Sequence, residues 1–304
     1  MGLKVQNVSK TFGEKLAVDN ISFEINKPGV FGLLGTNGAG KSTTIRMILG
    51  ILKKDSGTIT WNGKEVERKY VNFGYLPEER GIYPKIKISE QLMYLAKLKG
   101  MKKKDAEESM NFWLKRLEVE EYKNLTAEKL SKGNQQKIQF ITAVIHNPEL
   151  LVIDEPFSGL DPINTELLKS AILELVEKGT YIIMSSHQMA SIEEFCTDIL
   201  ILNKGKTILQ GNLKEIKESY KANRVELITK VDVSEQIQEE GLKIIKELDN
   251  QYEIAINDEL QAQDLLKRLV SRNIEVEKLE VKKPSLNDIF IEKVGDKWWE
   301  VYLQ

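Results

Sequence analysis

The sequence is poor in cysteine, in long apolar runs and in excess charge of either sign. One cysteine, Cys196, excludes an intramolecular disulfide, so we expect a reducing compartment and a small buried residue at this position. Neither the start, MGLKVQNVSK, nor any later window approaches the roughly 18 apolar residues that would span a bilayer. Forty-four basic against 46 acidic residues leave a net charge of −2, which gives no electrostatic footprint for nucleic acid.

The length and hydrophobic content set the scale of the fold. At 304 residues and 41% hydrophobic content, the chain can bury a full core and is longer than a usual single domain. We therefore expect a soluble globular protein of two domains.

A phosphate-binding loop follows the first apolar run. The run ends in Gly35, and the pattern G-x-x-x-x-G-K-S then continues through Thr36, Asn37, Gly38, Ala39, Gly40, Lys41 and Ser42, before the helical pattern that starts at Thr43. The glycines let backbone N–H groups bind phosphate oxygens, Lys41 supplies positive charge to the β and γ phosphates, and the Ser42 hydroxyl can ligate Mg²⁺. The order strand, loop, helix predicts a nucleotide site.

The base-reading motif of GTPases is missing. That motif, N-K-x-D, has its nearest match at residues 203–206, where Lys206 stands in place of the aspartate. A lysine cannot accept the hydrogen bonds that the guanine edge donates. This substitution disfavours GTP.

Two acids follow a second apolar run, residues 150–153. They are Asp154 and Glu155, and the carboxyl ends of parallel strands meet at one edge of an α/β sheet, so both are expected near the phosphate loop. Asp154 then holds Mg²⁺, and Glu155 polarises a water for attack on the γ-phosphate.

A histidine follows a third apolar strand, residues 181–184. His187 comes after Ser185 and Ser186 at the expected strand end, and we predict that it contacts the γ-phosphate and orients the attacking water. The other histidine, His146, precedes Asn147-Pro148 and is interpreted as a structural hydrogen-bonding residue.

The stretch LSKGNQQ, residues 130–136, contains more small polar groups than a helix start needs. Ser131 is the expected N-cap, and Ile138, Ile141 and Ile145 form the buried stripe of the helix. The glycine and amides also suit an anion held at the positive end of the helix dipole.

These motifs in this order, with Ser158-Gly159-Leu160-Asp161 between the acids and His187, strongly resemble the ATP-binding subunit of an ABC transporter over about residues 3–215. The resemblance implies an α/β P-loop NTPase domain of the ABC type, residues 1–215, with a helical subdomain at about 79–149 and a small α+β C-terminal domain at 221–304. It also implies ATP and Mg²⁺ as cofactors.

The resemblance further implies a head-to-tail homodimer, or a heterodimer with a similar subunit. Ser131, Gly133, Asn134 and Gln135 would close on the ATP in the opposite phosphate loop, and Asp161 would couple the two sites. Phe12, with Val18 nearby, matches the aromatic position that stacks on adenine. Separate membrane-spanning subunits would bring this cytoplasmic protein to the inner face of the membrane, with Tyr83 and Pro84 of the helical subdomain facing them. Tyr94 and Trp113 line the same surface or, as is usual at helical spacing, belong to the core.

Two positions depart from the commonest family pattern. Lys132 and Asn134 alter the usual LSGGQ signature, and Glu78 replaces the glutamine that senses Mg²⁺. A carboxylate still ligates Mg²⁺, with a full charge. Both variants resemble the sodium-exporter and drug-exporter branch, whose subunits carry an extra C-terminal domain.

The C-terminal region is predicted as strand, helix, strand, helix, strand, with the first helix over residues 234–248. From residue 221 onward, 18 acidic and 13 basic residues argue against a nucleic-acid-binding tail. Trp298, Trp299 and Tyr302 form either a docking patch or part of the packing of their own domain.

Two other functions remain open. A non-transport ABC ATPase acting on ribosomes or DNA usually has two motor units or a long coiled-coil insertion, and neither is visible here. A P-loop kinase acting on a small molecule would leave LSKGNQQ without a purpose.

Overall fold

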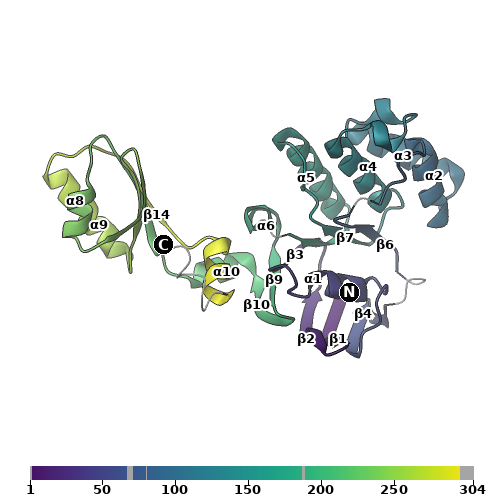
Figure 1. The fold of residues 1–304 in the computed structure, drawn as a ribbon, viewed down its shortest axis with the longest axis horizontal. Helices are drawn as coiled ribbons and strands as arrows, with labels where there is room; N and C mark the ends of the chain where they lie inside the picture. Colours follow the sequence, from purple (N-terminus) through teal and green to yellow (C-terminus); the bar gives the residue numbers. More distant parts are fainter. Residues whose placement is uncertain (1, 67–70, 80, 187–188, 295–304) are drawn as a thin grey trace. The chain divides into compact units, whose positions relative to one another are not determined.

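The computed structural model describes residues 2–66, 71–79, 81–186 and 189–294. The chain divides into two compact units, the first ending at Gly211 and the second beginning at Asn212. Figure 1 shows their elements in sequence colours. Among the described residues, no helix is long and apolar enough to cross a membrane.

An antiparallel sheet opens the first unit. Its order is β2-β1-β4-β5, with bounds Lys15–Ile25, Leu3–Phe12, Ser56–Trp61 and Lys64–Glu65. Apolar residues of β1 and β2 alternate into the core, as the period of a half-buried strand requires. The β1–β2 hairpin closes with Phe12 opposite Lys15, which brings these two side chains to the sheet end.

A six-stranded sheet, counted over the described residues, forms the centre of this unit. Its order is β10-β9-β3-β8-β7-β6, with bounds Lys206–Asn212, Asp198–Asn203, Gly29–Gly35, Tyr181–Ser185, Leu150–Asp154 and Phe73–Leu76. The strands from β9 to β6 run parallel. All five residues of β7 are buried, as expected for a strand that is covered on both faces. Asp154 is in register with Ser185, so β7 and β8 end side by side.

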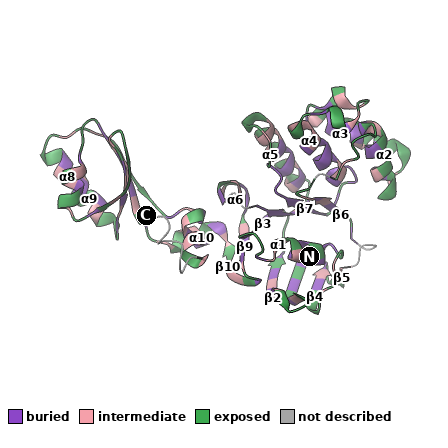
Figure 2. Cartoon of the chain, in the orientation of Figure 1, coloured by how far each residue is buried: buried purple, intermediate pink, exposed green. Residues whose placement is uncertain are grey.

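The main core lies between the two sheets and α1, Lys41–Ile48. Leu3 and Ile21 of the antiparallel sheet and Leu33 of β3 are fully buried in it. The rings of Phe23 and Phe31 stack there at 5.0 Å. Figure 2 shows the buried residues along these strands. This packing fixes β3, and therefore the start of the phosphate loop.

Helices inserted between β6 and β7 form a smaller layer. They are α2, α3 and α4, with bounds Ile88–Leu98, Lys103–Arg116 and Lys132–Val144, joined by the 3₁₀ turns Glu120–Tyr122 and Ala127–Lys129. The three helices pack against one another. Trp113 is 2% exposed and meets the Phe140 ring edge-on at 5.9 Å, so it belongs to this core and not to a surface. Two more helices follow, α5 at Pro162–Glu177 and α6 at Met189–Phe195.

The second unit begins with α7, Leu213–Ser219, and contains a split βαβ sheet. Its antiparallel order is β12-β13-β11-β14, with bounds Lys243–Leu248, Gln251–Ala255, Arg224–Thr229 and Val276–Lys282. Helices α8 and α9, at Ser234–Glu239 and Glu259–Ser271, supply the buried Ile237 and Leu265 of its core. Helix α10 spans Leu286–Val294.

One predicted element of the second unit is wrong. The helix expected over residues 234–248 ends at Glu239, and residues 243–248 form β12. Asp249 and Asn250 both have positive φ, 46° and 61°, and make the tight turn that pairs β12 with β13. This turn, and not the apolar spacing, decides the structure. Trp298, Trp299 and Tyr302 lie outside the described residues.

Two residues outside the motifs are buried as predicted. His146 is 7% exposed, and its Nε2 lies 2.9 Å from the carbonyl oxygen of Phe73, which confirms its structural role. Cys196 is free and buried, and burial raises the pKa of its thiol.

Candidate functional site

The phosphate loop leaves β3 at Gly35 and enters α1 at Lys41. Gly40 is the N-cap with φ 105°, and a Cβ there would lie 2.7 Å from the carbonyl oxygen of Ala17. Only glycine combines this left-handed backbone with so close an approach. Val18, predicted near adenine, is fully buried against Gly40. It packs under the loop and is not among the described residues that line the cavity.

A second segment supports the loop from the side. The turn between β9 and β10 places Gly205 so that its N–H donates to the carbonyl of Ala39 at 3.0 Å. The Gly205 carbonyl accepts from the N–H of Asp19 at 2.8 Å. Gly205 belongs to the segment 203–206, which lacks the aspartate of a guanine-binding motif. In the structure this residue joins the phosphate loop to β2.

The Lys41 side chain is hydrogen-bonded to the backbone of its own loop. Its Nζ donates to the carbonyls of Gly35 at 2.7 Å and Thr36 at 3.3 Å. Burial lowers the pKa of Lys41, and the nearby carboxylates of Glu155, Asp154 and Glu78 act in the opposite direction. These neighbours favour the charged ammonium that a phosphate needs.

A cavity of about 260 Å³ lies over the loop. Most predicted site residues line it, namely Phe12, Asn37, Gly38, Ala39, Gly40, Lys41, Ser42, Thr43, Glu78, Asp154 and Glu155. Lys15 and Ala17 also line it and were missed, although the hairpin that pairs Lys15 with Phe12 was a usable signal. Phe12 is 49% exposed, so its ring is accessible to a ligand.

Two hydroxyl groups hold the two acids. Ser185 donates to Oδ1 of Asp154, and Ser186 donates to Oε2 of Glu155 at 3.0 Å. Burial raises the pKa of Asp154, while the Ser185 hydrogen bond lowers it. Glu155 has a positive φ of 50°, a conformation that costs a non-glycine residue about 1–2 kcal/mol. Strain of this kind is common at functional sites.

The side chains around the cavity fit a magnesium–nucleotide complex. Within the described ranges, no group of three or more His, Cys, Asp or Glu side chains could hold a metal ion. Magnesium usually takes one or two carboxylates, waters and substrate phosphates, so a complete protein cage is not required. Ser42, Glu78 and Asp154 supply a hydroxyl and two carboxylates at the cavity. Their oxygen chemistry suits Mg²⁺ delivered with ATP.

The signature residues form the start of α4. Ser131 is the N-cap, and its Oγ accepts from the N–H of Asn134 at 3.3 Å. Nε2 of Gln135 donates to the carbonyls of Ala127 and Leu130, at 3.0 and 3.1 Å, so its amide N–H₂ is turned toward its own chain. Ser131, Gly133, Asn134 and Gln135 are not among the described residues that line the cavity. Ser131 is exposed, so a second molecule can reach it.

Asp161 caps α5. Its Oδ1 accepts from the N–H of Asn164 at 2.9 Å, and this hydrogen bond lowers the pKa of Asp161. Pro162 occupies the first turn of α5, where a missing backbone N–H costs no hydrogen bond. His187, expected beside Ser186, lies outside the described residues.

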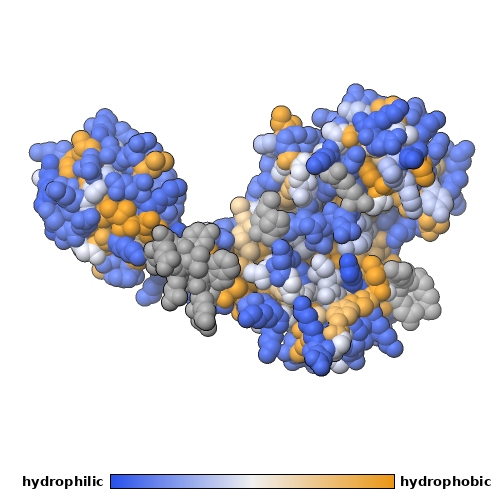
Figure 3. Space-filling view, in the orientation of Figure 1, coloured by the Kyte–Doolittle hydropathy of each residue, from blue (hydrophilic) through white to orange (hydrophobic). Residues whose placement is uncertain are grey.

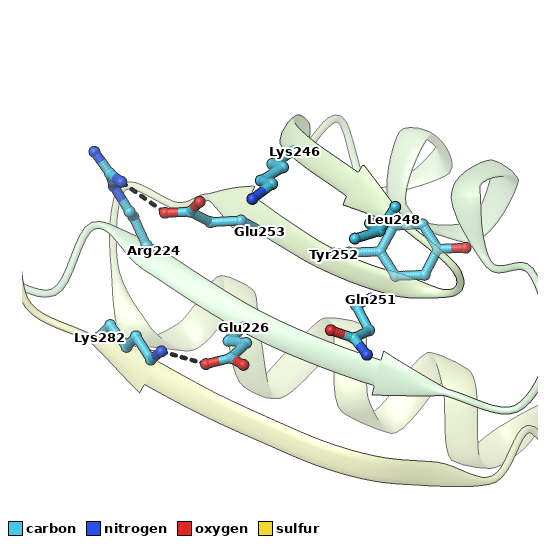
Figure 4. Close-up of a pocket in the computed structure, with 8 residues that line it drawn as sticks. All are labelled: Arg224, Glu226, Lys246, Leu248, Gln251, Tyr252, Glu253 and Lys282. Atoms are coloured by element: carbon cyan, nitrogen blue, oxygen red, sulfur yellow. Dashed lines mark hydrogen bonds and ion pairs between the residues drawn. The ribbon is translucent and has the colours of Figure 1, made fainter. Parts of the chain in front are cut away.

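A second hollow lies on the open face of the sheet in the second unit (Figure 4). Arg224 pairs with Glu253 at 2.6 Å and Lys282 pairs with Glu226 across neighbouring strands. The hydroxyl of the buried Tyr252 points away from these pairs and donates to Asp232 at 2.9 Å. Because the charged side chains of this hollow pair with one another, we interpret the hollow as a solvated face of the sheet.

The parallel sheet, its phosphate loop and the two acids at the carboxyl edge define a P-loop ATPase domain. The chain matches the family described as ABC transporter over residues 18–158, and the family described as ATP-binding protein DrrA1-3-like, C-terminal domain, over residues 211–294.

Individual proteins agree with the family matches. The chain is 49% identical to the uncharacterized ABC transporter ATP-binding protein YhaQ of Bacillus subtilis, over 96% of this chain and 98% of that protein. It is 32% identical to the linearmycin resistance ATP-binding protein LnrL of the same species, with 96% and 98% covered. A solved structure, titled as the ATP binding subunit of an ABC transporter, matches with a TM-score of 0.67 and 30% identity, over 72% of this chain and 93% of that one.

The chain belongs to the ATP-binding subunits of ABC transporters, which bind ATP and couple its hydrolysis to transport. The predicted family, fold class and ATPase activity are therefore confirmed.

Proposed function

We propose that this subunit powers an exporter through separate membrane-spanning chains, with Mg²⁺–ATP held in the cavity over the phosphate loop. The observation that carries the proposal is the presence of Lys41, Glu78, Asp154 and Glu155 around that one cavity. Export is supported by the signature and Glu78 variants and by the matched C-terminal domain family.

Each group has a part in hydrolysis. The loop N–H groups and Lys41 bind the phosphates, Ser42, Asp154 and Glu78 hold the magnesium ion, and Phe12 stacks on the base. Bound Mg²⁺ neutralises charge on the β and γ phosphates. Glu155 takes a proton from the attacking water, and His187 orients that water.

The second half of the site comes from another copy of the chain or from a similar subunit. Ser131 and Gly133 at the start of α4 face the γ-phosphate in the opposite phosphate loop, where N–H groups and the helix dipole favour an anion. Asp161 lies at the same interface. Closing of this dimer is the movement that ATP binding drives.

The membrane-spanning partner docks on α2 and the segment before it. Tyr83, Tyr94 and Leu98 are 50%, 55% and 65% exposed, and Pro84 is exposed beside them. Figure 3 shows small apolar patches over the region of α2, α3 and α4 within a mostly hydrophilic face. Exposed aromatic side chains are common anchors at protein interfaces.

One variant tests the mechanism. Glu155→Gln keeps the size of the side chain but removes the proton acceptor, so we expect ATP to remain bound and a dimer to accumulate in gel filtration with light scattering. Adding Ser131→Cys and Asn37→Cys should give a thiol crosslink between two copies only when ATP is present. A monomer with wild-type turnover, or a crosslink independent of ATP, would contradict the proposal.

A second experiment tests the partner. The membrane chain should co-purify with the wild-type subunit, and Tyr83→Ala with Tyr94→Ala should weaken this association while the isolated subunit still binds ATP. Unchanged co-purification would remove this surface from the proposal.

A further inference from the structure

A buried glutamine connects α4 to the segment that carries Glu78. Gln139 lies on α4 and is 1% exposed. Its Nε2 donates to the carbonyl of Pro77 and to the carbonyl of Glu79, both at 3.0 Å. These carbonyls belong to the residues before and after Glu78, so one amide group is hydrogen-bonded to the backbone on both sides of that residue.

The chemistry fixes the direction of this amide. Two carbonyl oxygens can only accept, so the N–H₂ end of Gln139 must face them. Its Oε1 is buried and has no hydrogen-bond partner among the described residues, which costs about 1–3 kcal/mol. The contact of Gln139 with this segment is therefore made through its two N–H donors.

The position of Gln139 along α4 gives the contact a further meaning. Ser131 caps the same helix eight residues earlier, which is about 12 Å along the axis. A helix of this length moves as one body, so displacement of its N-terminus also displaces the segment around Glu78. No comparable link is visible in the sequence, where residues 78 and 139 are far apart.

We propose that Gln139 is a positioning residue that sets the Glu78 carboxylate toward the magnesium–nucleotide complex and ties that carboxylate to the movement of α4. The inference rests on the proposed metal role of Glu78. Outer-shell partners of metal ligands typically change metal affinity 10- to 100-fold when they are removed.

The test uses Gln139→Met in the full chain, because methionine keeps length and apolar volume but has no N–H donor. Binding of a fluorescent ATP analogue is measured as the Mg²⁺ concentration is varied. We expect the Mg²⁺ concentration at half-maximal binding to rise about tenfold, with binding in EDTA unchanged. Hydrogen exchange of the amides in residues 76–79 should also become faster.

Gln91→Met is the matched control. Gln91 is 2% exposed, and its Nε2 also holds two loop carbonyls, those of Tyr83 and Ile86, at 3.5 and 3.2 Å. Gln91→Met also removes two hydrogen bonds to loop carbonyls, so it should lower the unfolding temperature and leave the Mg²⁺ response unchanged. Equal Mg²⁺ shifts in both variants would mean that the effect is only loss of stability, and would overturn the inference.

A double-mutant cycle separates this inference from the proposed function. If Gln139 acts through Glu78, Gln139→Met adds nothing to the Mg²⁺ shift caused by Glu78→Gln. The positioning role would be overturned if the two Mg²⁺ shifts added, or if Glu78→Gln shifted the Mg²⁺ dependence and Gln139→Met did not. Either result would leave the ATP site intact. Failure of the wild-type chain to bind ATP at any Mg²⁺ concentration would instead overturn the proposed function. If Gln139→Met does not fold, Gln139→Asn, which keeps the amide but shortens its reach, serves in the same cycle.

Discussion

The hydroxyl of Ser186 donates a hydrogen bond to Oε2 of Glu155 at 3.0 Å, joining the ends of β8 and β7. The bond holds one carboxylate oxygen and so orients the other one. Because Glu155 is the proposed base, Ser186→Ala should lower kcat for ATP hydrolysis about tenfold and leave KM nearly unchanged. Steady-state kinetics of the purified subunit measures both. An equal rise in KM with constant kcat would show that Ser186 serves binding instead.

Lys41→Ala should weaken ATP binding about 100-fold, because the ammonium is the only side-chain cation that the loop itself supplies to the phosphates. Calorimetric titration measures the change. The variant should keep its far-ultraviolet circular dichroism spectrum, so that the loss reflects binding and not unfolding. Unchanged ATP affinity would refute the phosphate-loop role.

Gly40→Ala should destabilise the phosphate loop by about 2 kcal/mol or more, since the new methyl group would lie 2.7 Å from a backbone carbonyl at a φ of 105°. Gly38→Ala is the control, because φ is also positive, 78°, but the position opens into free space. Urea unfolding should show a clearly larger loss for Gly40→Ala. Equal losses would indicate that backbone strain alone, and not the contact with Ala17, sets the cost.

His146 should make the fold sensitive to acid. Burial, with a smaller contribution from Lys99, lowers the pKa of His146 from 6.5 to about 4. Between these values the unfolded chain takes up a proton that the folded chain does not, so the free energy of unfolding falls as pH drops through this window. The loss approaches about 3 kcal/mol near pH 4. Urea unfolding between pH 7 and 4 should show this slope, and His146→Asn should remove most of it. A slope that persists in the variant would assign it to other groups.

Removing residues 221–304 should leave ATP binding within about threefold of the wild type, because the described residues lining the cavity all precede Gly211. Fluorescent nucleotide binding and far-ultraviolet circular dichroism test the shortened chain. A folded fragment without ATP affinity would mean that the second unit contributes to the site.

Local patterns were sufficient where a motif is continuous in the chain. The phosphate loop, the acids at the end of β7 and the N-cap at Ser131 were predicted because the strand, the glycine turn and the helix start are formed by neighbouring residues. The prediction failed at residues 243–248, where the apolar spacing is compatible with a helix or a strand. Pairing with β13 and the turn at Asp249 and Asn250 decided for a strand.

The sequence by itself determined the family, the ATP chemistry and the order of the nucleotide-binding motifs, because each of these depends on residue types at short, fixed spacing. Only the tertiary structure decided that Gly205 holds Ala39 and that Gln139 reaches across to the backbone around Glu78. These contacts join residues far apart in the chain, and their partners are backbone carbonyls, which every residue carries and which therefore leave no mark in the sequence.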